Sequence, residues 1–192
     1  MTILPLPLIL GSSSEFRALE LRNAGYDFIV RTADIDEKKI RHTDLRKLPL
    51  FIAEAKVEAL LPQIQEPSIL LTADVVVIAN GELREKPIDE TQARTWFHSY
   101  SSGVPAVIYT GLVVVNTKTG KRAEGIDECV VHWNHIPENA VEKIIADGTI
   151  FKTAGGFTNE IALEFGRQPL PSGDRRRGIP IYLFEELVQK VL

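Results

Sequence analysis

The chain has 192 residues, of which 44% are hydrophobic and 25% charged, and its formal net charge is −4. This composition is typical of a folded globular protein, and we expect a single domain over residues 1–192. The acidic balance argues against binding to a nucleic-acid polymer. The apolar run Ile3–Leu10 is too short to span a bilayer and contains two prolines, so we expect no membrane partner. The single cysteine, Cys129, excludes an internal disulfide and fits a cytoplasmic location.

Apolar patterns and turn signals predict strands and helices that alternate along the chain. Asn80-Gly81 is a strong signal for a type I′ hairpin turn between two of the strands. A hairpin among alternating strands and helices predicts an α/β fold with a mixed sheet. In chain order, we expect strand 6–10, helix 15–24, strand 26–30, helix 49–61, strands 69–78 and 82–84, helix 90–100, strands 104–115 and 126–133, and helices 137–148 and 180–192.

A serine-rich loop, Gly11-Ser12-Ser13-Ser14, separates the first strand from the first helix. Backbone N–H groups at a helix N-terminus, together with hydroxyls, suit an anion such as phosphate. Arg17 fits this interpretation, because a cation in the first helical turn opposes the helix dipole unless an anion lies nearby. The alternative is an ordinary serine N-cap beside a solvated arginine, and this segment alone leaves both open.

Lys56 lies on the apolar face of the predicted helix 49–61. Its neighbours three and four positions away are Ile52, Ala53, Ala59 and Leu60. The commoner explanation for such a lysine is a buried stem with the ammonium extended into solvent. The other explanation is a lysine that reaches from a packed helix into a polar cleft.

Asp74 interrupts the apolar run Ile69–Ile78, where a charge needs a partner or a metal, so it is the best single site candidate. A bulge or a solvent-facing strand position is the alternative. Lys86 follows the hairpin and returns to the same neighbourhood. An ideal two-residue turn sets Lys86 opposite Val75, on the other face from Asp74, so the two share a cleft only if the ladder ends or bulges first.

A series of short motifs stands in a specific order and spacing. They are Ser12-Ser13-Ser14-Glu15-Phe16-Arg17, Asp34-Ile35-Asp36-Glu37, Lys56, Ala73-Asp74-Val75-Val76-Val77, Lys86-Pro87, Ala154-Gly155-Gly156-Phe157 and Gly178-Ile179-Pro180. Over essentially the whole chain this set resembles the Maf family of nucleoside triphosphate pyrophosphatases. Two positions depart from the family pattern: Ala18 stands where a second arginine is usual, and Val75 where a threonine is usual.

The resemblance implies an α/β fold in which a mixed sheet is flanked by helices, with two lobes around a central cleft, often in a homodimer. It implies hydrolysis between the α and β phosphates of a nucleoside triphosphate, giving the monophosphate and pyrophosphate with a divalent cation, Mg²⁺ or Mn²⁺. Asp74 would be the catalytic residue, holding the metal or orienting water, with Glu37 or Asp36 as a second acidic group. The phosphates would contact Ser12, Ser14, Arg17, Lys56 and Lys86, whose types suit a triphosphate.

Substrate choice in the family is tied to positions that here hold Phe16, Val75 and Glu160. One subgroup, acting on dTTP and UTP, tends to have arginine and glutamine at the positions of Phe16 and Glu160. The other, acting on 7-methyl-GTP, tends to have an aromatic residue and a glutamate, so this chain leans to 7-methyl-GTP, although Val75 fits neither. The alternatives are a dTTP/UTP pyrophosphatase and a nucleotide-binding regulator of cell division that has lost turnover.

Overall fold

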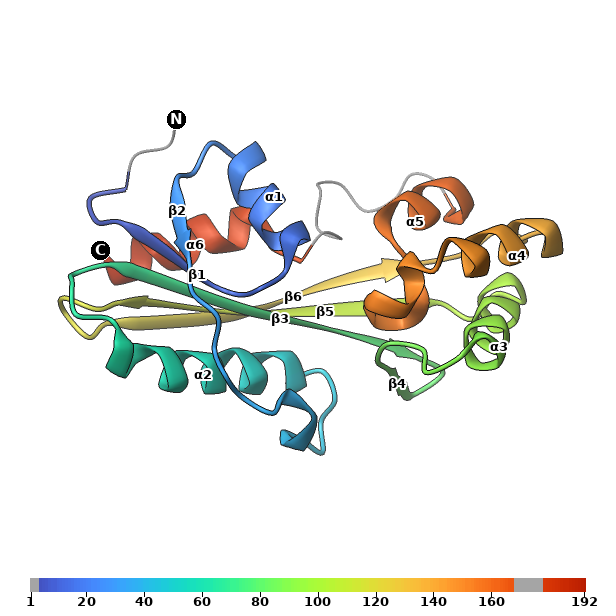
Figure 1. The fold of residues 1–192 in the computed structure, drawn as a ribbon, viewed down its shortest axis with the longest axis horizontal. Helices are drawn as coiled ribbons and strands as arrows, with labels where there is room; N and C mark the ends of the chain where they lie inside the picture. Colours follow the sequence, from blue (N-terminus) through green and yellow to red (C-terminus); the bar gives the residue numbers. More distant parts are fainter. Residues whose placement is uncertain (1–3, 168–177) are drawn as a thin grey trace. The chain divides into compact units, whose positions relative to one another are not determined.

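The computed structural model describes residues 4–167 and 178–192. At its centre is a six-stranded sheet with the order β2-β1-β3-β5-β6, and β4 pairs with β3 (Figure 1). β1 pairs in parallel with β2 and β3, whereas β4 runs antiparallel to β3, so the predicted mixed sheet is confirmed. The strands are β1 (Leu8–Gly11), β2 (Phe28–Val30), β3 (Ile69–Ala79), β4 (Glu82–Arg84), β5 (Ala106–Asn116) and β6 (Arg122–Val131).

The chain folds into two compact units, each assembled from segments far apart in sequence. Among the described residues, unit 1 comprises 4–75, 110–127 and 178–192, and unit 2 comprises 76–109 and 128–167. The long strands β3, β5 and β6 contribute residues to both units. Neither unit is therefore a continuous stretch of the chain.

In unit 1, helices cover both faces of the sheet (Figure 1). Helices α1 (Glu15–Asn23) and α6 (Ile181–Val191) pack on one face, where Leu71, Leu112 and Phe184 belong to one apolar core. Helix α2 (Leu48–Leu60) packs on the other face, and its Val57 lies in a second core with Val113. Alternate strand residues supply these two cores, as the two-residue period of a strand requires.

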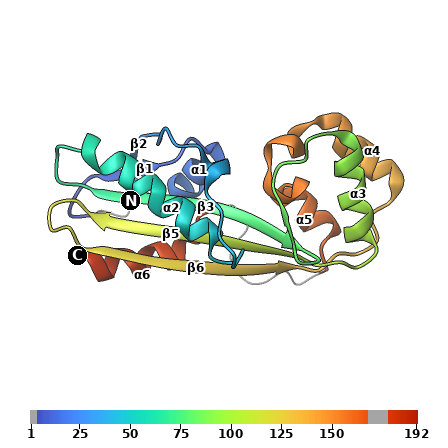
Figure 2. The same ribbon diagram turned by 90° about the horizontal axis from the view of Figure 1, so that it is seen from below.

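Unit 2 contains the helices α3 (Glu90–Ser101), α4 (Glu138–Asp147) and α5 (Asn159–Phe165), which lie together in Figure 2. Its centre is aromatic: the ring of Tyr100 stacks on Trp133 at 4.9 Å, and Phe157 meets Trp133 edge-on at 5.0 Å. The predicted type I′ turn is confirmed, because Asn80 and Gly81 both have positive φ, 53° and 75°.

Two parts of the fold differ from the expectation. β6 begins at Arg122 rather than residue 126, and α5 was not predicted. Short 3₁₀ segments also occur at Glu37–Lys39, Leu61–Gln63, Thr149–Lys152 and Ala154–Gly156. Within the described ranges, no helix combines the length and apolar character needed to cross a membrane.

Candidate active site

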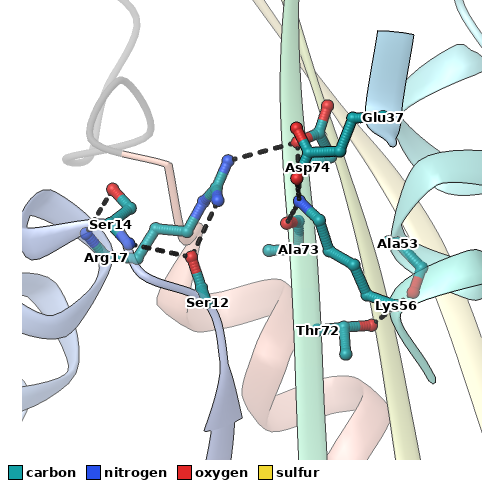
Figure 3. A network of polar contacts seen from close by, with 9 residues as sticks. All are labelled: Ser12, Ser14, Arg17, Glu37, Ala53, Lys56, Thr72, Ala73 and Asp74. Atoms are coloured by element: carbon teal, nitrogen blue, oxygen red, sulfur yellow. Dashed lines mark hydrogen bonds and ion pairs between the residues drawn. The ribbon is translucent and has the colours of Figure 1, made fainter. Parts of the chain in front are cut away.

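The serine loop leaves β1 at a point where only glycine fits. A Cβ on Gly11 would lie 2.7 Å from side-chain carbons of both Leu60 and Thr72. Ser14 then caps α1, because its Oγ accepts a hydrogen bond from the Arg17 N–H at 3.5 Å. The Ser12 Oγ accepts from the Ser14 N–H at 3.2 Å and from Arg17 Nη1 at 2.9 Å (Figure 3). The loop is thus an N-cap that also holds the guanidinium.

The alternative of a serine N-cap beside a solvated arginine is right about the cap and wrong about Arg17, which is not solvated. Its Nη2 lies 3.7 Å from Asp74 Oδ1, and both side chains are largely shielded from solvent. The contact is possible because β1 stops short of β3: the last paired residues are Gly11 and Thr72, so Asp74 lies beyond the end of β1. The guanidinium crosses this open strand edge to reach the carboxylate (Figure 3).

Lys56 is buried through its whole length, being 4% exposed, so the solvent-extended alternative is wrong. Its Nζ contacts Asp74 Oδ1 at 2.9 Å, Glu37 Oε1 at 2.8 Å and the Ala73 carbonyl at 3.2 Å. These three acceptors match the three donors of an ammonium group. The lysine therefore joins β3 to the 3₁₀ segment that carries Glu37 (Figure 3).

Asp74 carries a charge in an environment that disfavours it. The residue is 7% exposed, and burial raises the pKa of its carboxyl above the ordinary value. The cations Lys56 and Arg17 oppose this rise, while the carboxylate of Glu37 adds to it. A buried carboxylate between two cations is the kind of perturbed group that gathers at active sites.

Two carboxylate oxygens, from Asp74 and Glu37, converge on one cation, the Lys56 ammonium. Mg²⁺ in phosphate-processing sites is commonly held by one or two carboxylates together with substrate phosphates, so this pair fits such an ion. Across residues 4–167 and 178–192, no three His, Cys, Asp or Glu side chains form a metal-binding group. Asp36, the other acidic candidate, pairs instead with Lys39 at 3.2 Å.

The remaining candidates lie on exposed or half-buried positions. Phe16 in α1 is 48% exposed, so it does not pack in the core, and Val75 in β3 is half-buried. Lys86 and Glu160 belong to unit 2 and are exposed, Lys86 just after β4 and Glu160 in the first turn of α5. Ala18, where the family usually has a second arginine, is buried in the core under α1.

One supporting residue was missed by the sequence analysis. The Thr72 hydroxyl donates to the Ala53 carbonyl at 2.7 Å, joining α2 to β3 one turn before Lys56. A hydroxyl inside an apolar strand was the available signal, because a buried hydroxyl needs a hydrogen-bond partner. This bond fixes the position from which Lys56 reaches Asp74.

The protein has an α/β fold, and a cluster of two cations and two carboxylates lies at the end of β1 and along β3. Residues 7–189 match the family model described as Maf-like protein, so the chain belongs to the Maf family. The predicted family resemblance is thereby confirmed.

Curated relatives align over most of this chain. A "7-methyl-GTP pyrophosphatase" from Dictyostelium discoideum is 40% identical over 192 residues, covering 96% of this chain and 97% of the relative. One of the same description from Vibrio vulnificus is 30% identical, covering 95% and 84%. A "nucleoside triphosphate pyrophosphatase" from Nostoc punctiforme is 28% identical, covering 80% and 77%.

Proposed function

We propose that the chain is a nucleoside triphosphate pyrophosphatase that acts as one domain, with 7-methyl-GTP as the favoured substrate. The main support for this proposal is the position of the Lys56 ammonium between the carboxylates of Asp74 and Glu37, with Arg17 beside Asp74. A triphosphate needs cations for its charge and a positioned group to aim water at phosphorus. This cluster contains both.

In the proposed reaction, water attacks the α-phosphorus and the bond from that phosphorus to the bridging oxygen breaks. The water oxygen stays on the nucleoside monophosphate, and pyrophosphate departs. The Asp74 carboxylate accepts a hydrogen bond from the attacking water, which fixes its direction, and takes up the proton that the water loses. Arg17 and Lys56, with Lys86 as a further phosphate contact, stabilise the negative charge that builds on the phosphate oxygens. Ser12 and Ser14 orient Arg17 and contact phosphate through their hydroxyls.

A divalent cation, Mg²⁺ or Mn²⁺, completes the proposal. Asp74 and Glu37 would hold it, and when bound it would neutralise developing charge on the phosphates. Lys56 keeps the two carboxylates close together without the ion, because both lie within 2.9 Å of its Nζ.

The preference for 7-methyl-GTP is supported by Phe16 and by the relatives that carry that name. An exposed aromatic ring on α1 offers a face on which a cationic 7-methylguanine ring stacks strongly. Glu160 is the proposed acceptor for donors on the base edge. dTTP and UTP, which lack the positive ring, should then be poorer substrates.

The test is pyrophosphate release from 7-methyl-GTP, GTP, CTP, UTP and dTTP, with Mg²⁺ or Mn²⁺ and with a chelator. We expect a monophosphate product, the highest kcat/KM for 7-methyl-GTP, and a reduced preference in Glu160→Gln. Nucleotide binding without any pyrophosphate release would favour the regulator without turnover. A panel led by dTTP or UTP would overturn the substrate preference.

A further inference from the structure

A second polar cluster of unit 1 lies on the sheet face that α1 and α6 cover. It consists of Thr110 in β5 and Asp127 in β6, which are 1% and 3% exposed. α6 covers this face next to Asp127, because a Cβ on Gly125 would meet Leu183 of α6 at 2.9 Å. Asp127 follows Gly125 by two residues and therefore points to the same side.

Hydrogen bonds at the strand ends fix how these residues align. The Asn116 N–H donates to the Lys121 carbonyl at 3.0 Å, which pairs these two residues where β5 meets β6. Six residues further from this turn on each strand, Thr110 of β5 lies opposite Asp127 of β6. The Thr117 N–H donates to the Ser68 carbonyl at 2.9 Å, and counting in the same way along β5 and β3 sets Val75 opposite Thr110. Val75, Thr110 and Asp127 thus form one row across three strands, about 10 Å long at the usual strand spacing.

This row begins beside the charged cluster of Arg17, Lys56, Asp74 and Glu37. A Cβ on Gly178, which has a φ of +95°, would lie 3.3 Å from Arg17 Cγ and 3.7 Å from Val75 Cγ2. Val75 is therefore a near neighbour of the arginine that contacts Asp74. If Arg17 and Lys56 bind the phosphates of a nucleotide, its sugar and base extend over a distance similar to the length of the row.

Two oxygens of the row are buried without a hydrogen-bond partner. Asp127 Oδ1 accepts from the Tyr182 hydroxyl, but Asp127 Oδ2 has no partner in the part of the chain that the structure describes. The Thr110 hydroxyl is also buried and unpartnered there. Buried oxygens left unpaired are destabilising, and in folded proteins a ligand or an ordered water pairs such groups, so these two oxygens are available to a ligand with matching groups.

We propose that Thr110 and Asp127 read the Watson–Crick edge of a guanine-type base, an inference that rests on the proposed function and names a specificity determinant for it. That edge presents a carbonyl oxygen, a ring N–H and an amino group in succession. The Thr110 hydroxyl donates to the carbonyl, Asp127 Oδ2 accepts from the ring N–H and one amino N–H, and the second amino N–H is left for Glu160. A buried carboxylate also favours the positive charge of a 7-methylated ring.

Both oxygens are closed off from water in this structure. Access of a base to them requires that the α6 side chains over the row, Leu183 among them, move aside. Polar groups that are dry and unpaired without ligand discriminate strongly against bases that cannot satisfy them. Uracil and thymine share the carbonyl and the ring N–H but present a second carbonyl in place of the amino group. That carbonyl would face the Asp127 carboxylate, so these bases should pair less well with this row.

The experiment measures kcat/KM for 7-methyl-GTP, GTP and UTP in the full chain and in the near-isosteric variants Asp127→Asn and Thr110→Val. We expect Asp127→Asn to lower kcat/KM for both guanine substrates at least ~10-fold and for UTP far less. Thr110→Val should shift the ranking in the same direction. Tyr182→Phe is the matched control, because it removes the partner of Oδ1 and leaves Oδ2 in place, so the ranking should stay that of the wild type.

The possible outcomes distinguish a failure of this inference from a failure of the proposed pyrophosphatase function. Equal losses for all substrates, or an unchanged ranking in both variants, would show that Asp127 only holds α6 through Tyr182 and would overturn the inference. If Asp127→Asn does not fold, Thr110→Val decides alone. A wild-type chain that releases no pyrophosphate from any nucleotide would overturn the proposed function instead.

Discussion

Replacing Lys56 by methionine tests the central ion pair, because methionine keeps most of the buried volume and removes the charge. The change leaves Asp74 buried with Arg17 as its remaining cation, 3.7 Å away. Removing one partner of a buried ion pair lowers the free energy of unfolding by about 3–5 kcal/mol. Because Arg17 still pairs with Asp74, we expect a loss of about 3 kcal/mol in this variant. Urea denaturation at pH 7 measures that loss. Lys39→Met is the control, since Lys39 pairs with Asp36 at the surface and should change stability by less than about 1 kcal/mol.

The loss of stability in Lys56→Met should depend on pH in a defined direction. Burial already raises the pKa of the Asp74 carboxyl above its ordinary value, and removing Lys56 takes away a cation that lowers this pKa. A carboxyl whose pKa is higher in the folded than in the unfolded chain destabilises the fold as pH rises through the interval between the two values. The difference between wild type and variant should therefore be larger at pH 7 than near pH 4.

Turnover should fall along with stability. A charge-assisted phosphate contact contributes about 1.5–3 kcal/mol, which corresponds to a loss of roughly 10- to 150-fold in kcat/KM for pyrophosphate release. The measurement is made at a temperature where the variant is folded by circular dichroism. A folded Lys56→Met with near wild-type kcat/KM, or with a stability loss no larger than that of Lys39→Met, would refute the role assigned to Lys56.

Three further outcomes are expected. Asp74→Asn should abolish pyrophosphate release while circular dichroism remains that of the wild type, and a folded, active variant would contradict the assignment. Lys86→Ala should lower kcat/KM on the order of tenfold with little change in Tm, if this exposed lysine binds phosphate. Gly111→Ala should lower stability by about 1–3 kcal/mol, because the new Cβ would lie 2.4 Å from the backbone nitrogen of Leu50. Gly125→Ala meets only the end of a flexible side chain at 2.9 Å and should lower Tm less than Gly111→Ala does.

Much of the fold could be predicted from apolar periodicity, and the exceptions have a physical explanation. β3 and α2 were located within one or two residues because each is a long apolar run with a clear stop. The start of β6 was missed because Arg122 and Glu124 are polar and Gly125 is a poor strand former. α5 spans seven residues, too few to show a helical period.

The individual residues of the candidate site could be predicted from the sequence, but the contacts between them could not. Asp74 and Lys56 each stood out as a charge among apolar neighbours. Whether they meet depends on how α2 is aligned with β3, and that alignment is set by the Thr72 hydrogen bond, which no local pattern specifies. Asp127 gave no signal, because an acidic residue in a strand of alternating polarity is usually solvated.

The division of unit 1 into three chain segments affects how the protein is made. Ser12, Arg17, Lys56 and Asp74 leave the ribosome early, yet the core on one face of β1 and β3 is completed by Phe184, Leu187 and other residues of α6. During synthesis, the segment up to β3 has an uncovered apolar sheet face until more than a hundred later residues have emerged. A nascent chain stalled before α6 would expose that face, which makes it a natural substrate for chaperones.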